Sequence, residues 1–98
     1  RRIAALEPTP PFAIFYLGRD AYRRRDFAEA VAMLERVSGN TAASPRLLNL
    51  LARAREKVGR LDEAADAYAA SLRSDARQMG VHFRLGRILL AKYVAEGL

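Results

Sequence analysis

Apolar residues recur along this chain at intervals that place them on one face of an α-helix. In the first such segment, Ile14, Leu17, Gly18 and Ala21 stand at i, i+3, i+4 and i+7. Similar spacing returns in four later segments, and glycine, serine or proline, the residues that commonly start and stop helices, separate several of them. The pattern predicts an all-α chain with helices over about 11–24, 27–37, 45–58, 61–72 and 79–92.

Local signals support several of these boundaries. Thr9 is expected to cap the first helix, and Ser44 followed by Pro45 predicts a capped start for the third. Gly39 and Gly59 are expected to end helices, because glycine readily adopts the left-handed conformation at a helix C-terminus.

The helical pattern repeats with a period of 34 residues. Leu17, Leu51 and Leu85 stand one period apart, and each is followed by a small residue. A second column, three residues earlier, consists of Ile14, Leu48 and His82. Both columns are interpreted as packing positions, and His82 is accordingly interpreted as a packing residue rather than a ligand.

One domain of stacked helix pairs follows from this period. Within residues 1–98 we expect the tail of a preceding helix at 1–8, complete units at 11–44 and 45–78, and a partial unit at 79–98. Residues 94–98 (VAEGL) repeat the start of the earlier second helices, FAEAV and LDEAA, and are expected to begin another second helix.

The pattern resembles the tetratricopeptide repeat family. The matching residues are Leu17-Gly18, Asp26-Phe27, Ala30, Gly59, Ala64, Tyr68 and Leu85-Gly86. Arg25 replaces the usual turn glycine and is expected to adopt a costly positive φ. Ala42 and Ala76 replace the usual closing proline, and the aromatic residue of the first helix is absent. The resemblance implies a right-handed α-α superhelix, a solenoid of antiparallel helix pairs whose concave groove is lined by the first helix of each unit.

Arginines recur on the predicted groove side. The residue two positions after each repeated leucine points away from the core, and these residues are Arg19, Arg53 and Arg87, here named the arginine row. Neighbours on the same face complete a candidate peptide-binding set: Phe15, Arg19, Tyr22, Arg23, Arg46, Asn49, Arg53, Lys57, Phe83 and Arg87. The carboxylate clamp of some family members does not carry over, because Phe15, Arg19 and Leu50 occupy its places and only Arg84 fits.

The net charge of +6 indicates an acidic partner. We therefore expect a protein-interaction scaffold that binds an acidic or carboxylate-bearing peptide in a basic groove. Three alternatives stay open: a nucleic-acid-binding repeat, an accessory segment of a larger protein or enzyme, and self-association through the terminal helices. A solvated arginine face without a ligand is the plainest reading of the same residues.

Other chemistry finds little support in the sequence. The chain has no cysteine and one histidine, so we expect no metal site and no cofactor. Its serines lack a partner base and no glycine-rich phosphate loop is present, so we expect no enzyme. No apolar run reaches the roughly 20 residues that span a bilayer. The compartment stays open, with the cytoplasm favoured and the periplasm the alternative.

Overall fold

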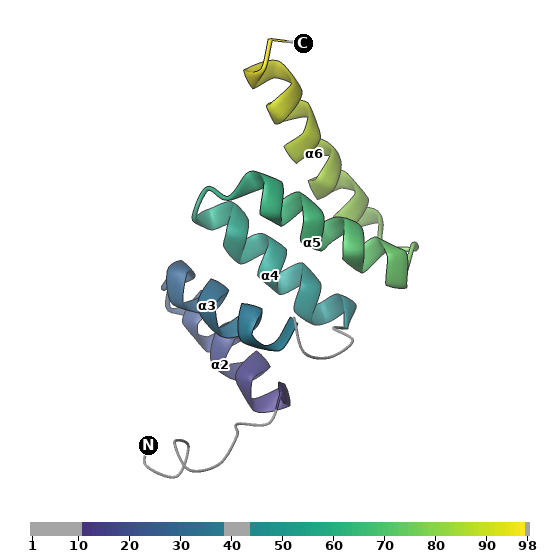
Figure 1. Cartoon of the computed structure of the whole chain (residues 1–98). Coiled ribbons are helices and arrows are strands. Elements are labelled where there is room, and N and C mark those ends of the chain that lie inside the picture. Colours follow the sequence, from purple (N-terminus) through teal and green to yellow (C-terminus); the bar gives the residue numbers. More distant parts are fainter. Residues whose placement is uncertain (1–10, 39–43, 98) are drawn as a thin grey trace.

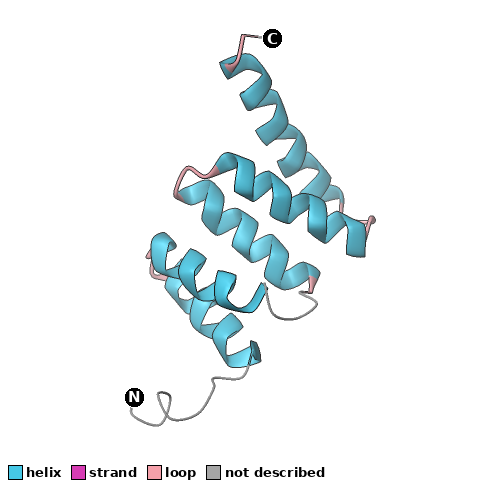
Figure 2. Cartoon of the chain, viewed as in Figure 1, coloured by secondary structure: helices cyan, strands magenta, loops and turns pink. Residues whose placement is uncertain are grey.

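The computed structural model describes residues 11–38 and 44–97 as helices stacked in antiparallel pairs (Figure 1). No strand occurs among these residues, which are helical apart from short connections (Figure 2). The helices are α2 (Pro11–Arg23), α3 (Phe27–Ser38), α4 (Pro45–Lys57), α5 (Leu61–Ser74) and α6 (Met79–Ala95). The expectations for residues 1–8, Thr9, Gly39 and Ala42 lie outside the described residues.

Packing runs between neighbours along the chain. α2 packs on α3 and α4 on α5, α3 joins the first pair to the second, and α2 also approaches α4. The molecule measures 51 × 25 × 20 Å, with a radius of gyration of 14.4 Å. A compact domain of this length would have a radius of gyration of about 12.6 Å. The fold is therefore an elongated all-α helical-repeat solenoid.

The core forms two clusters, each of which extends from one unit into the next. The first joins α2, α3 and α4 through Ile14, Ala21, Ala30, Val31, Leu34, Val37, Leu47, Leu51 and Ala54. The second joins α4, α5 and α6 through Ala52, Ala64, Ala67, Tyr68, Val81 and Ile88. Because α4 contributes to both clusters, neither helix pair is buried independently of its neighbour.

The repeated leucines differ in burial. Leu51 is 1% exposed and belongs to the first cluster, and Leu85 packs against the second. Leu17 is 47% exposed, so the prediction that it faces the core is wrong. The column faces the preceding unit, as the cluster membership of Leu51 shows, and no described residue precedes α2 to cover Leu17.

Two expectations for the third unit are also wrong. His82 is exposed rather than packed, with its Nε2 atom 2.8 Å from the carbonyl oxygen of Ala76. Its equivalent Ile14 is buried in the first core cluster, which includes the second helix α3, whereas the described residues place no second helix after α6. Residues 94 and 95 continue α6 instead of starting a new helix, because the backbone first turns left-handed at Gly97 (φ 75°).

Caps and turns agree with the sequence. The Ser44 side chain accepts a hydrogen bond from the backbone N–H of Leu47 at 3.2 Å, which confirms the predicted cap. Arg25 has a φ of 67° at the position where the second unit has Gly59, at 86°. The predicted positive φ at Arg25 is therefore confirmed.

A network of charged groups ties the two complete units together. The guanidinium of Arg55, on α4, lies 3.0 Å from the carboxylate of Glu35 on α3 and donates to the backbone carbonyl of Glu63 on α5 at 2.9 Å. The Arg55 side chain is only 16% exposed. This arrangement fixes α4 against both of its neighbours and thereby orients the face on which the candidate site lies.

Candidate functional site

Three cations of α4 lie over aromatic rings of the preceding unit. Arg46 lies over Phe15 with 5.2 Å from guanidinium carbon to ring centroid, and Arg53 lies over Tyr22 at 5.5 Å. The ammonium of Lys57 lies 5.7 Å from the ring centroid of Phe27. We name these three pairs the cation–aromatic ladder. Each pair joins the second unit to the first.

Helix geometry explains the alignment. Arg46, Arg53 and Lys57 are separated by seven and four residues, so they share one face of α4. Phe15 and Tyr22 are likewise seven residues apart on α2. Phe27 begins α3 and meets the Tyr22 ring edge to face, with centroids 5.1 Å apart and planes at 71°.

The three rings provide a fixed support for the cations. Phe15, Tyr22 and Phe27 are half-buried, and the first two pack against the first core cluster. Arg46, Arg53 and Lys57 are exposed, and a cation over a ring at an exposed site gains about 0.5–1 kcal/mol. This attraction restrains the long side chains above the rings without using their hydrogen-bond donors.

No carboxylate of the described residues forms an ion pair with Arg46, Arg53 or Lys57. The ion pairs among these residues involve Arg24, Arg55, Arg60 and Lys92. Glu56, next to Lys57, accepts a hydrogen bond of 2.5 Å from the hydroxyl of buried Tyr68. Burial, and then this bond, raise the pKa of Tyr68. The Glu56 carboxylate therefore bonds to α5 and not to the ladder. The three ladder cations form no ion pair with a described carboxylate, so they can donate to a ligand.

The arginine row does not act as one unit in the structure. Arg19 lies over Tyr16 of its own helix at 5.2 Å, and Arg87 lies over Phe83 of its own helix at 6.0 Å. Only Arg53 of the row belongs to the cation–aromatic ladder. Arg23 is exposed, and Phe83 is 68% exposed on α6.

Asn49 differs from the other candidates because its amide is already bonded. Its Nδ2 donates to Oε1 of Gln78 at 2.9 Å, and the Gln78 amide donates in turn to Ser71 Oγ at 3.0 Å and the Asp75 carbonyl at 2.8 Å. The Asn49 Oδ1 atom is buried with no hydrogen-bond partner among the described residues. Asn49 therefore links α4 to the segment before α6, and its role toward a ligand stays a prediction.

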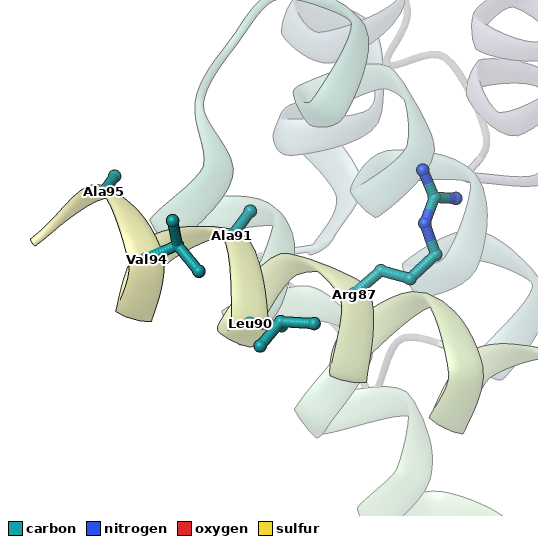
Figure 3. A pocket seen from close by; sticks show the side chains of 5 residues that line it. All are labelled: Arg87, Leu90, Ala91, Val94 and Ala95. Carbon is teal, nitrogen blue, oxygen red and sulfur yellow. The ribbon is translucent and has the colours of Figure 1, made fainter. Parts of the chain in front are cut away.

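An open hollow of about 550 Å³ lies on α6. Its lining residues all come from this one helix: Arg87, Leu90, Ala91, Val94 and Ala95 (Figure 3). Arg87 and Ala91 are the α6 equivalents of Arg53 and Lys57, one period later. The face that is cationic on α4 is therefore largely apolar on α6.

Sequence reasoning missed Phe27 as a ring of the site, together with Gln78 and the apolar lining Leu90 and Val94. A signal for the ladder was present in the sequence. Phe15 precedes Arg46, and Tyr22 precedes Arg53, by 31 residues, three fewer than the period. This constant offset marks which position of one unit lies beside which position of the next.

Residues 11–38 and 44–97 contain no group of histidine or carboxylate side chains placed to hold a metal ion. Over the same ranges, no helix combines the length and the apolar character needed to cross a membrane.

Antiparallel helix pairs with a 34-residue period and a shared core define a helical-repeat protein. A family model described as tetratricopeptide repeat matches residues 16–78 and, in a second register, residues 49–92. The chain belongs to the tetratricopeptide repeat family. Repeats of this family generally mediate protein–protein interactions and typically form non-catalytic scaffolds. A search of curated proteins finds no match for the chain.

Proposed function

We propose that the surface formed by the first helices α2, α4 and α6 binds an acidic or carboxylate-bearing segment of a protein partner. The observation that carries this proposal is the cation–aromatic ladder, in which three cations are restrained over rings and paired with no carboxylate of the described residues. The proposal takes α2 as the first helix of the repeat unit 11–44, α4 as that of the unit 45–78, and α6 as that of the partial unit 79–98.

The chemistry of the ladder suits carboxylates. Arginine presents a planar fork of donors that matches a carboxylate in a two-bond arrangement, and two of the three cations are arginines. Because the side chains are restrained before a ligand arrives, less conformational entropy is lost on binding. The net charge of +6 adds long-range attraction for an acidic partner.

The same geometry argues against base stacking. Proteins that bind single-stranded nucleic acid offer open aromatic faces on which bases stack. Phe15, Tyr22 and Phe27 are half-buried and already have cations over their rings. The proposal is therefore a peptide ligand, and nucleic acid is an outcome of the test.

A matched pair of double variants tests the proposal. The first double variant, Arg46→Gln with Arg53→Gln, removes two charges of the ladder. The control, Arg73→Gln with Arg77→Gln, removes two exposed charges that lie outside the ladder, one in the last turn of α5 and one just after α5. The probes are a fluorescent glutamate-rich peptide and a fluorescent single-stranded oligonucleotide, followed by anisotropy at several salt concentrations. The ladder variant should weaken peptide binding about five- to tenfold, and the control should leave it nearly unchanged.

Two results would contradict the proposal. Equal weakening by both double variants would mean that net charge alone attracts the peptide. Binding of the oligonucleotide with no binding of the peptide would assign the face to nucleic acid.

Self-association is a second candidate, carried by apolar side chains exposed at both ends of the stack. Phe12 is 68% exposed and Leu17 47% on α2, and Leu90 and Val94 are 63% and 68% exposed on α6. Such faces commonly bind another surface. Sedimentation over a hundredfold range of concentration tests it, and a constant monomer mass would remove this candidate.

A further inference from the structure

The spacing of the ladder cations restricts the shape of the ligand. Arg46 and Arg53 are seven residues apart on α4, and Arg53 and Lys57 are four apart. At a rise of 1.5 Å per residue these intervals are roughly 10.5 Å and 6 Å along the helix axis. At 100° per residue, the three side chains leave α4 within about 40° of one another.

Each charged end lies over a separate ring, and the rings are spaced in a similar way. Phe15 and Tyr22 are seven residues apart on α2, and the centroids of Tyr22 and Phe27 are 5.1 Å apart. The three rings come from half-buried positions of the first unit, and the cation-to-ring distances are 5.2, 5.5 and 5.7 Å. A ligand that engages all three cations must therefore present three acidic groups on one side, at the same two intervals.

An extended peptide does not meet this requirement. At about 3.4 Å per residue the intervals correspond to three and two residues, and side chains three apart in a strand point to opposite sides. A polyproline II peptide rises about 3.1 Å per residue with three residues per turn. Side chains three residues apart therefore align and fit the longer interval, of roughly 10.5 Å. The shorter interval corresponds to about two residues, so the third acidic group points to another side.

An α-helix meets both intervals at once. Acidic residues at i, i+4 and i+11 lie on one face, separated by roughly 6 and 10.5 Å. In an antiparallel arrangement the first acidic residue would face Lys57 and the last would face Arg46. This direction places the helix dipoles of the ligand and α4 antiparallel, which is the electrostatically favourable arrangement of two adjacent helices.

We infer that the cation–aromatic ladder binds an acidic helix that lies antiparallel to α4, with carboxylates at i, i+4 and i+11. The inference rests on the proposed function and narrows its ligand from an acidic segment of any shape to one helical face. The Glu56 carboxylate, on the same stretch of α4, accepts a hydrogen bond from Tyr68 of α5 and forms no ion pair with a ladder cation.

Three synthetic peptides of about 18 residues, long enough for measurable helicity in an alanine-rich sequence, test this inference. The first carries glutamates at i, i+4 and i+11. The second has the same composition with glutamates at i, i+5 and i+10, which spreads them around the helix so that no two share a face. The third keeps the first spacing and has a central proline that breaks the helix. The fluorescent glutamate-rich peptide of the preceding test, in a version with interspersed glycines that prevent helix formation, serves as the reference.

The first peptide should bind about tenfold more tightly than the second and third, since roughly three exposed ion pairs are made together only in that register. Arg46→Gln with Arg53→Gln should abolish the difference, and Arg73→Gln with Arg77→Gln should preserve it. Equal binding of all three designed peptides would overturn the helical ligand and leave the acidic-peptide function standing. Binding of the reference peptide alone would do the same, whereas failure of all four would overturn the proposed function as well.

Discussion

At the scale of single residues, Gly18 and Gly86 occupy the same position of the repeat but differ in the space around them. A Cβ atom built on Gly18 would lie 2.7 Å from Cγ and Cδ2 of Leu34, a fully buried side chain of α3. Gly86 stands two periods after Gly18, and a Cβ atom built there would meet no atom within 4 Å. The difference arises because α3 covers α2, whereas no described helix covers the same side of α6.

These two glycines give a prediction of opposite sign for one substitution. Gly18→Ala should lower the free energy of unfolding by about 1–2 kcal/mol, because overpacking against Leu34 exceeds the gain in helix propensity. Gly86→Ala should raise it by up to about 1 kcal/mol, because only the helix-propensity gain remains. Urea denaturation of both variants beside the parent chain measures the difference. A Gly18→Ala variant as stable as the parent would show that Leu34 moves aside without loss.

At the scale of elements, the turns between paired helices are nearly identical in backbone form and different in chemistry. The N–H of Asp26 donates to the carbonyl of Ala21 at 2.9 Å, and the N–H of Arg60 donates to the carbonyl of Arg55 at 2.9 Å, one period later. Between them stand Arg25 in the first turn and Gly59 in the second, both with positive φ. A left-handed conformation is unfavourable for arginine and freely available to glycine.

Arg25→Gly should therefore stabilise the α2–α3 pair. Relief of the left-handed backbone is worth about 1 kcal/mol, and loss of the Arg25 contact over Phe27, at 5.7 Å, removes roughly half of that gain. Gly59→Ala is the matched reverse change and should destabilise by about 1 kcal/mol, since its surroundings are open and only the backbone is strained. Thermal unfolding of the two variants tests the pair. Destabilisation by Arg25→Gly would show that the Phe27 contact outweighs the backbone strain.

The helices were predictable from sequence because their signals are local. The starts at Pro11, Phe27, Pro45, Leu61 and Met79 are as predicted, since caps, prolines and turn residues lie beside them. The exposure of Leu17 and His82 was not predictable in this way. Burial in those columns depends on whether a neighbouring helix covers them, which the residue itself does not encode.

The cations of the candidate site were predictable from the sequence, and the rings beneath them were not. Helical periodicity identified Arg46, Arg53 and Lys57 as one face, because that follows from a single helix. It did not identify the rings beneath them, because pairing α4 with α2 requires the offset between successive units. The same limit applies to Asn49, whose bond to Gln78 crosses from α4 to the segment before α6.

At the scale of the whole molecule, interactions run between neighbours and do not close on themselves. The first and last helices of the stack lie at opposite ends of the long dimension (Figure 1). α2 and α3 pack on each other and on α4, whereas α5 packs on α4 and α6. In such an arrangement stability is approximately a sum of unit terms and interface terms.

Local destabilisation should consequently remain local, which native-state hydrogen exchange can measure. Gly18→Ala perturbs the α2–α3 contact, so amide exchange should accelerate in α2 and α3 by about tenfold for each 1.4 kcal/mol lost. Amides of α5 should change little, because no partner of α5 is touched by the substitution. α4 should show an intermediate effect, since it belongs to both core clusters and holds Glu35 through Arg55. Uniform acceleration through α5 would instead show that the described units unfold as one cooperative body, and the Arg55 network would then be the first contact to remove.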